Sequence, residues 1–208
     1  LRKDTKGAVR IVSMHGLINN LIHRTLASFS TEHPNVRISI DTLNRARLEE
    51  VIQEMQFDIA FATLPVRAPA SLTIDSLAAL PAICNVPARH PLARRKVIKA
   101  HQLEGVPFIS ERQETLLRSR VDAVFDKLNI HRSMQFECHN TETICDMVAA
   151  GMGVSIVHPF IKMSRDHAYV EKPFQPNILL EYAMITAPKG RISRHAELLA
   201  RRVLAEAK

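Results

Sequence analysis

A regular alternation of strand-like and helix-like segments in the first 64 residues constrains the fold more than any other feature of the sequence. The predicted elements are a strand over residues 8–13, a helix over 17–29, a strand over 36–40, a helix over 48–55 and a strand over 57–64. His33-Pro34 ends the first helix, because proline has no backbone N–H and cannot continue it. The order β-α-β-α-β favours a parallel sheet in an α/β fold.

The rest of the chain continues the alternation after a proline-containing loop. The predicted elements are strands over residues 77–86, 105–110, 134–138, 154–157 and 179–187, and helices over 116–128 and 192–203. Asn140 or Thr141 caps a further helix, and Gly151 and Gly153 end it. Both halves therefore share a strand-helix-strand order, which predicts two α/β lobes that face one another.

The composition and charge narrow the class of protein. At 208 residues with 46% hydrophobic content, the chain is long enough to bury real cores. The formal charge of +7 would suit a nucleic-acid partner, but the basic residues are scattered over separate segments without interleaved aromatic residues. We therefore expect a solvated basic surface and no direct binding of nucleic acid by this chain.

The sequence lacks the motifs that mark redox-active, membrane-spanning, catalytic and metal-binding proteins. Cys84, Cys138 and Cys145 have no CxxC spacing, which indicates reduced thiols of a cytoplasmic protein. No apolar run approaches the ~20 residues of a membrane span. The motifs GxSxG, HExxH, GxGxxG and the P-loop are missing, and the ten histidines show no metal spacing. We expect no metal, no cofactor and no catalytic residues.

Polar residues recur where a predicted strand ends and a helix begins. The predicted ligand contacts are Ser13, Met14, His15, Asn44, Arg45, Ser110, Glu111, His139, Asn140 and Thr141. Carboxyl ends of parallel strands form the crevice where open α/β sheets bind ligands. Arg45 would suit an anionic group and Glu111 a cationic one. The alternative reading is that these residues cap helices or are solvated; Phe61 would floor the cleft or belong to the core.

The same residues carry a family likeness. The stretch GAVRIVSMHGLINNLIHRTLASFSTEHPNVRISI resembles the opening of the effector-binding domain of LysR-type transcriptional regulators. LEEVIQEMQFDIAFATLP, PARHPLA and TETICDMVAAGMGVSIVHP resemble later segments of the same domain, in the same order. The likeness runs from Gly7 to about Ala205, and its specificity lies in the ordered set rather than in any single motif.

The resemblance implies two Rossmann-like subdomains joined by two crossover strands, like a type II periplasmic binding protein. Residues 1–78 with 167–208 would form the first subdomain, and residues 79–166 the second. A small effector would bind in the cleft between them, at the junction residues above and at His158. It would carry a carboxylate and be zwitterionic, as amino acids and opines are. The family also implies a homo-oligomer, a dimer that becomes a tetramer at full length.

The family's winged helix-turn-helix lies N-terminal to this domain and is absent from the sequence, so DNA binding is expected only of the full-length protein. A solute-binding protein for transport is the main alternative, because it would have the same fold. An enzyme on this scaffold would need an acid or base in the cleft, and His15 with Glu111 is the only pair to offer. We therefore expect a binding module and not an enzyme.

Overall fold

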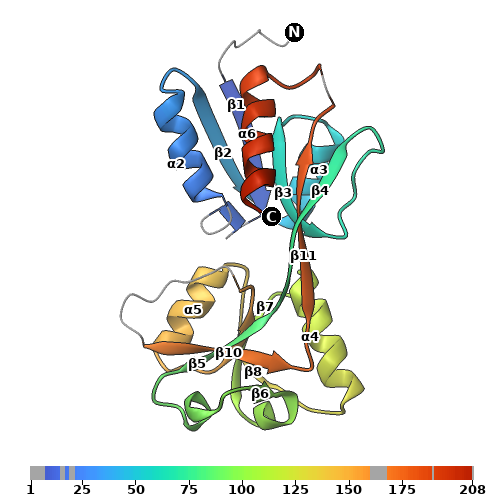
Figure 1. Cartoon of the computed structure of the whole chain (residues 1–208). Helices are drawn as coiled ribbons and strands as arrows, with labels where there is room; N and C mark the ends of the chain where they lie inside the picture. The colour runs from blue at the N-terminus through green and yellow to red at the C-terminus, as the bar shows by residue number, and fades with distance from the viewer. Residues whose placement is uncertain (1–7, 15–16, 19–21, 160–167, 189, 208) are drawn as a thin grey trace. The chain divides into compact units, whose positions relative to one another are not determined.

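The computed structural model describes residues 8–14, 17–18, 22–159, 168–188 and 190–207 (Figure 1). The chain forms two compact units, unit 1 with residues Leu1–Ala79 and Glu181–Lys208, and unit 2 with residues Leu80–Leu180. The boundaries fall inside strands β4 (Thr73–Pro81) and β11 (Leu179–Thr186), so these strands cross from one unit into the other. This arrangement confirms the predicted α/β class with two crossover strands.

Unit 1 is built on a five-stranded sheet in the order β2-β1-β3-β11-β4. Its remaining elements are β1 (Ala8–Met14), β2 (Arg37–Leu43), β3 (Ile59–Leu64), α2 (His23–Glu32), α3 (Arg45–Gln53) and α6 (Arg194–Glu206). Strand β1 is parallel to β2 and β3, while β11 is antiparallel to β3. The predicted β-α-β-α-β order is thus confirmed for the described residues, and the last strand joins the same sheet.

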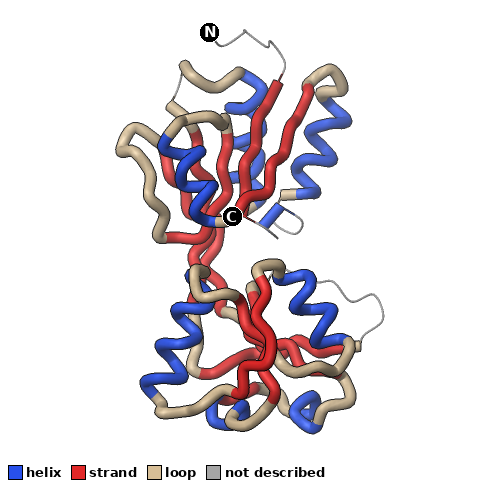
Figure 2. Tube along the Cα trace, turned by 180° about the vertical axis from the view of Figure 1, so that it is seen from behind, coloured by secondary structure: helices blue, strands red, loops and turns tan. Residues whose placement is uncertain are grey.

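Helices cover both faces of this sheet (Figures 1 and 2). Helix α3 packs Leu48, Val51 and Ile52 against Val12 and the residues of β3 on one face. Helices α2 and α6 contact one another, and α6 also contacts β1. Because side chains alternate along a strand, Ile11 points to the face opposite Val12, and both are almost fully buried. The sheet is therefore the middle layer of three.

Unit 2 contains a four-stranded sheet, β6-β10-β5-β9, and the parallel pair β7-β8. Its elements are β5 (Ile83–Pro87), β6 (Ile98–Lys99), β7 (Pro107–Glu111), β8 (Ser133–Cys138), β9 (Ser155–Val157), β10 (Tyr169–Gln175), α4 (Leu116–Lys127), α5 (Thr141–Ala149) and the short helices η1 (Pro91–Arg94) and η2 (Ala100–Leu103). A parallel bridge between Phe108 and Val154 connects the two sheets. Helix α5 packs on Ile109 and Val157.

Two predictions about this region were wrong. The single strand expected over residues 77–86 is two strands, β4 and β5, interrupted at Ala82, whose N–H donates to the carbonyl of Ile178. Residues 167–180 were assigned to the first subdomain, but their described part, 168–180, belongs to unit 2. Strand β10 pairs there with β5 and β6. Its apolar signal is weak, because Glu, Lys and Pro separate Tyr169 from Phe174.

A pair of buried polar side chains lies beneath α5. Asn85 of β5 and Ser155 of β9 are directly opposite in the antiparallel register, and both are fully buried. Asn85 Nδ2 donates to Cys145 Sγ at 3.3 Å, but Asn85 Oδ1 and Ser155 Oγ have no hydrogen-bond partner among the described residues. A buried polar atom without a partner costs about 1–3 kcal/mol. These two atoms therefore weaken the core of unit 2.

We expect Ser155→Ala to stabilise the protein by about 1 kcal/mol, because it removes a buried hydroxyl that nothing satisfies. The matched control is Val157→Ala in the same strand, which should lose about 2 kcal/mol because it only removes buried apolar atoms. Urea unfolding followed by circular dichroism measures both. A Ser155→Ala protein less stable than the wild type would show that the hydroxyl is satisfied.

Candidate functional site

Polar side chains gather at the carboxyl ends of the parallel strands in each unit. In unit 1, strands β1, β2 and β3 end together. The residues there, called the unit 1 edge, are Met14 and the polar residues Ser13, Asn44, Arg45 and Thr63. In unit 2, strands β7 and β8 end together, and the corresponding unit 2 edge consists of Ser110, Glu111, Asn140, Thr141 and His158. Each edge is described by itself.

At the unit 1 edge, three polar groups are already linked. The Ser13 hydroxyl is buried and donates to the Met14 carbonyl at 2.8 Å. Met14 Sδ accepts from the Thr63 N–H at 3.4 Å and from Thr63 Oγ1 at 3.3 Å. Thr63 was missed in the sequence, where it is one of the last residues of an apolar strand. Its position beside Met14 depends on strand pairing, which the residue pattern does not give.

Arg45 and Asn44 make mainly structural contacts. Arg45 Nη1 donates to the Thr63 carbonyl at 3.4 Å, Nη2 donates to the Pro65 carbonyl, and the guanidinium pairs with Glu49 at 3.0 Å. Asn44 Oδ1 accepts from the Arg47 N–H at 2.9 Å and so caps α3. The charge of Arg45 is therefore balanced within unit 1, and its N–H groups anchor the end of β3.

Two other predicted contacts are less informative. Phe61 is 1% exposed and lies in the middle of the sheet, opposite Met184 of β11, which agrees with the core reading of this residue. His15 lies outside the described residues.

At the unit 2 edge, Glu111 and Thr141 form a buried polar pair. Glu111 is the last residue of β7 and is 5% exposed, and its Oε1 accepts a hydrogen bond from Thr141 Oγ1 at 3.0 Å. Thr141 is the first residue of α5.

Asn140 caps helix α5, since its Oδ1 accepts from the N–H groups of Glu142 at 2.8 Å and Thr143 at 3.2 Å. The predicted capping role of Asn140 is confirmed. Ser110, next to Glu111, is also buried.

The two predicted histidines differ in environment. His158 follows β9 and is partly buried; burial lowers its pKa, and the negative charge of Glu111 opposes this by raising it. The imidazole is therefore neutral at pH 7. His139, by contrast, has a side chain about half exposed, and its Nε2 lies 2.9 Å from Oε1 of Glu114, which is equally exposed. Such a surface pair contributes little to stability, and nothing in it marks a binding site.

A buried arginine that the sequence reading missed fixes the end of β7. Arg118 of α4 is 3% exposed, and its Nη1 donates to the Glu111 carbonyl at 2.9 Å and to Glu137 Oε1 at 2.5 Å. Its Nε contacts both carboxylate oxygens of Asp122, at 2.8 and 2.9 Å. The spacing of Arg118 and Asp122 on a predicted helix was the only sequence signal. The network ties α4 to the ends of β7 and β8, where Glu111 stands.

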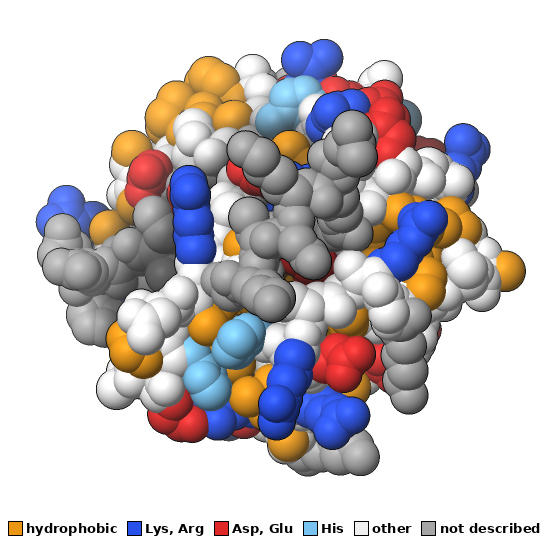
Figure 3. All heavy atoms as spheres, turned by 90° about the horizontal axis from the view of Figure 1, so that it is seen from above, with side chains coloured by type: hydrophobic (Ala, Val, Ile, Leu, Met, Phe, Trp, Pro, Cys, Tyr) orange, Lys and Arg blue, Asp and Glu red, His pale blue; other side chains and the backbone are white. Residues whose placement is uncertain are grey.

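Other parts of the described chain offer little chemistry. A surface pocket of about 790 Å³ in unit 2 is lined by Lys99, His101, Leu128 and their neighbours, and contains no predicted site residue. Within the described ranges, no three His, Cys, Asp or Glu side chains are grouped to hold a metal ion. No described helix is long and apolar enough to cross a membrane. On the face shown in Figure 3, Lys and Arg side chains are dispersed rather than gathered in one patch.

The two buried cysteines, Cys84 and Cys145, are not activated as nucleophiles. Burial raises the pKa of Cys145 to about 11 and raises that of Cys84 as well, so both thiols stay protonated.

Comparison with known proteins identifies relatives among transcription regulators. A family model described as LysR substrate binding domain matches residues 2–208. The regulatory protein NocR of Agrobacterium tumefaciens (strain T37) is 25% identical over 186 residues, which are 89% of this chain and 62% of that protein. The transcriptional activator protein LysR of Escherichia coli is 28% identical over 159 residues, 76% of this chain and 51% of that protein. The chain spans about half to three fifths of the length of these relatives.

Solved structures share the fold. The regulatory domain of CcmR from Synechocystis PCC6803, in complex with 2-PG, superposes with a TM-score of 0.84 at 18% identity and covers 97% of this chain and 98% of its own. The effector binding domain of QuiR, in complex with shikimate, has a TM-score of 0.81 at 14% identity and covers 98% of both chains. At this identity the likeness establishes the fold alone.

Proposed function

The chain belongs to the LysR substrate binding domain family, and from this premise we propose that it binds a small carboxylate-bearing effector at the carboxyl ends of its parallel strands, where the unit 1 edge and the unit 2 edge lie. Binding would control transcription by the full-length protein. One observation carries the proposal: Ser13, Thr63 and Glu111 are buried polar residues at the carboxyl ends of parallel strands, and Thr141 is buried at the start of the helix that follows β8. The cores of the two units are otherwise mostly apolar. Ligands of open α/β sheets bind at such ends.

The first turn of α5 supports a carboxylate as one group of the effector. Helix N-termini carry a partial positive charge and present N–H groups, which favours anions there. The Thr141 hydroxyl lies on this turn and donates to the Glu111 carboxylate. The imidazole of His158, which is neutral at pH 7, interacts electrostatically with the same Glu111 side chain. Relatives of known fold are described with small molecules, 2-PG for CcmR and shikimate for QuiR.

The curated relatives are regulators of transcription, which favours this function over solute binding for transport. The enzyme hypothesis rested on His15 with Glu111, and His15 lies outside the described residues. We propose that the protein has no catalytic activity of its own, that its full-length form binds DNA through an N-terminal winged helix-turn-helix, and that it acts in the cytoplasm, where such regulators meet DNA.

A thermal-shift screen against amino acids, opines and aromatic acids tests effector binding. A ligand that binds only the folded protein stabilises it by about 2.7 kcal/mol at 100 times its Kd, which raises the melting temperature. We expect Thr141→Val to lose the shift, because it removes the hydroxyl but keeps the shape of the side chain. Thr143→Val, an exposed position in the same helical turn, should keep it. An equal shift in both variants would exclude the unit 2 edge as the site.

We propose that a second copy of the chain binds to the outer strands β2 and β8, which contain none of the residues of the unit 1 edge and the unit 2 edge. Strand β2 is an edge strand in unit 1 and exposes 42% of Ile40, and β8 is an edge strand in unit 2 and exposes 43% of Met134. Exposed edge strands with apolar residues are sites of association unless another element covers them. We propose that β2 of one copy and β8 of another take part in a dimer interface.

Ile40→Glu and Met134→Glu are each expected to convert the dimer to a monomer, because either places a charge in the proposed interface. Light scattering after size-exclusion chromatography measures the mass. Leu198→Glu on α6, which is 36% exposed, is the control and should remain dimeric. The proposed interface is wrong if both edge variants keep the mass of the wild-type dimer, or if the wild type itself is monomeric.

A further inference from the structure

Glu111 is a buried carboxylate that forms no ion pair with a described Lys or Arg residue. Glu111 is 5% exposed, and none of the ion pairs among the described residues includes its carboxylate. Its one hydrogen-bond partner among the described residues is the Thr141 hydroxyl at Oε1, while Oε2 has none there and is not fully buried. Removing a carboxylate from water is costly unless a charge or several hydrogen bonds compensate it.

The charged and polar neighbours do not supply this compensation. Arg118, the nearest buried guanidinium in the hydrogen-bond network, reaches the backbone carbonyl of Glu111, and its remaining contacts go to Asp122 and Glu137. Burial keeps the pKa of His158 low, so the imidazole is neutral at pH 7. Thr141 contributes a neutral hydroxyl. These described neighbours therefore leave the Glu111 carboxylate without a compensating positive charge.

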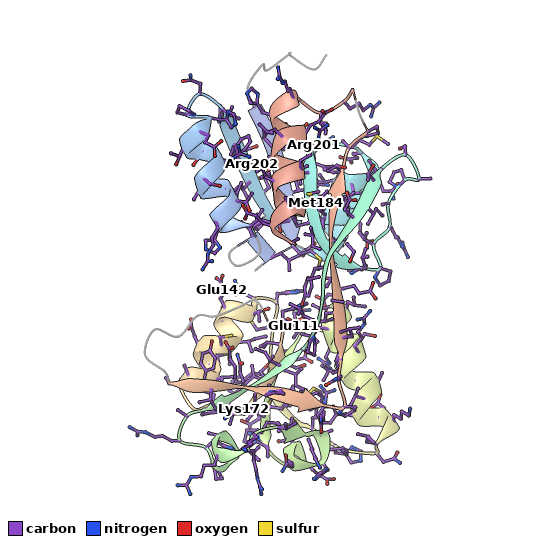
Figure 4. All side chains as sticks on the ribbon, in the orientation of Figure 1. Glu111, Glu142, Lys172, Met184, Arg201 and Arg202 are labelled. Atoms are coloured by element: carbon purple, nitrogen blue, oxygen red, sulfur yellow. The ribbon has the colours of Figure 1, made fainter. Side chains whose placement is uncertain are left out.

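The backbone that carries Glu111 is held in place, and Thr141 orients its carboxylate. The Arg118 hydrogen bond fixes the Glu111 carbonyl, and the register of β7 with β8 pairs Glu111 with Cys138. Glu142, in the first turn of α5, adds a second carboxyl group at the same end of unit 2 (Figure 4). Side chains positioned before the ligand arrives bind with less loss of conformational entropy. Within the unit 2 edge, Glu111 is thus positioned to receive a cation.

We propose that Glu111 binds a protonated amine or guanidinium of the effector and determines specificity for it. This inference rests on the proposed function and narrows the effector from carboxylates in general to zwitterions, such as amino acids and their conjugates. The cation replaces water at Oε2 and forms a charge-assisted hydrogen bond in a partly desolvated place, where such bonds are strong. The Thr141 hydroxyl keeps the other oxygen oriented.

Matched ligand pairs test the inference by calorimetry on the whole domain. Each pair consists of an amino acid and the same acid without its amino group, for example L-norleucine with hexanoate and L-glutamate with glutarate; shikimate and benzoate represent amine-free ring acids. We expect at least one amino acid to bind, and its des-amino partner to bind at least tenfold more weakly. Glu111→Gln should weaken the amino acid at least tenfold, whereas Glu114→Gln, at an exposed side chain, should not change its affinity.

The ligand-free variant gives an independent check. Glu111→Gln should melt a few degrees above the wild type, because it removes an uncompensated buried charge but keeps an acceptor for Thr141. Binding of only amine-free acids, or equal binding to Glu111→Gln and wild type, would overturn this inference and leave the proposed function standing. Binding of neither class would overturn both.

Discussion

Replacing Arg118 by methionine is expected to destabilise the protein by about 3–5 kcal/mol, because it removes one partner from a buried charge network. The guanidinium is 3% exposed and donates to Asp122, Glu137 and the Glu111 carbonyl. Burial by itself lowers the pKa of Arg118, but its hydrogen bonds to Glu137 and Asp122 more than reverse this, so the net shift is upward. The charge is therefore kept, and its carboxylate partners depend on it.

Arg112→Met is the control for this prediction. Arg112 pairs with Glu114 at 3.3 Å, and both side chains are 54% exposed, so its loss should cost less than about 1 kcal/mol. Urea unfolding at pH 7 compares the two variants. A loss below about 1 kcal/mol for Arg118→Met would mean that Asp122 and Glu137 find other partners, Arg132 being the nearest, since it also contacts Asp122.

Gly153→Ala should cost about 3 kcal/mol, the second largest effect we expect. A Cβ at this position would lie 2.5 Å from the Pro107 carbonyl oxygen and 2.9 Å from its carbon. That carbonyl cannot move freely, because it accepts from the Val154 N–H at 2.9 Å, and Val154 in turn accepts from the Ile109 N–H at 2.9 Å. These bonds join β7 to the start of β9, so the methyl group must push apart two backbones in the core.

Gly151→Ala separates this clash from ordinary glycine effects. Gly151 has a φ of +82°, and nothing lies within 4 Å of an added Cβ, so its substitution should cost only about 1–2 kcal/mol of backbone strain. Thermal and urea unfolding of the two variants give the comparison. If Gly153→Ala is no less stable than Gly151→Ala, the contact with Pro107 is not as rigid as the hydrogen bonds imply.

Local patterns in the sequence predicted most of the elements but not their partners. Pro34, the Asn140 cap and Gly151 mark helix ends through local chemistry, and the structure has them as expected. Strand β10 escaped prediction because its burial comes from pairing with β5, while its own sequence alternates too weakly. The break at Ala82 similarly reflects where the chain leaves one sheet for the other.

The candidate site was predicted in part for the same reason. The alternation of strands and helices predicted that Ser13, Glu111 and Thr141 lie where a strand ends or a helix begins. The structure places them at such ends. The roles of Arg45 and Arg118 depend on which groups surround them. Arg45 was expected to be available for an anion, but Glu49 and two carbonyls occupy it. Arg118, on a helix face, gave no sign of being buried.

The most direct test of effector binding at the two edges is a 1H–15N spectrum of the domain recorded during titration with a ligand found in the screen. We predict that the largest changes will occur at the amides of Ser13, Thr63, Glu111 and Thr141, with small changes elsewhere. Changes confined to the pocket lined by Lys99, His101 and Leu128 would contradict the account, because they would place the effector away from both edges.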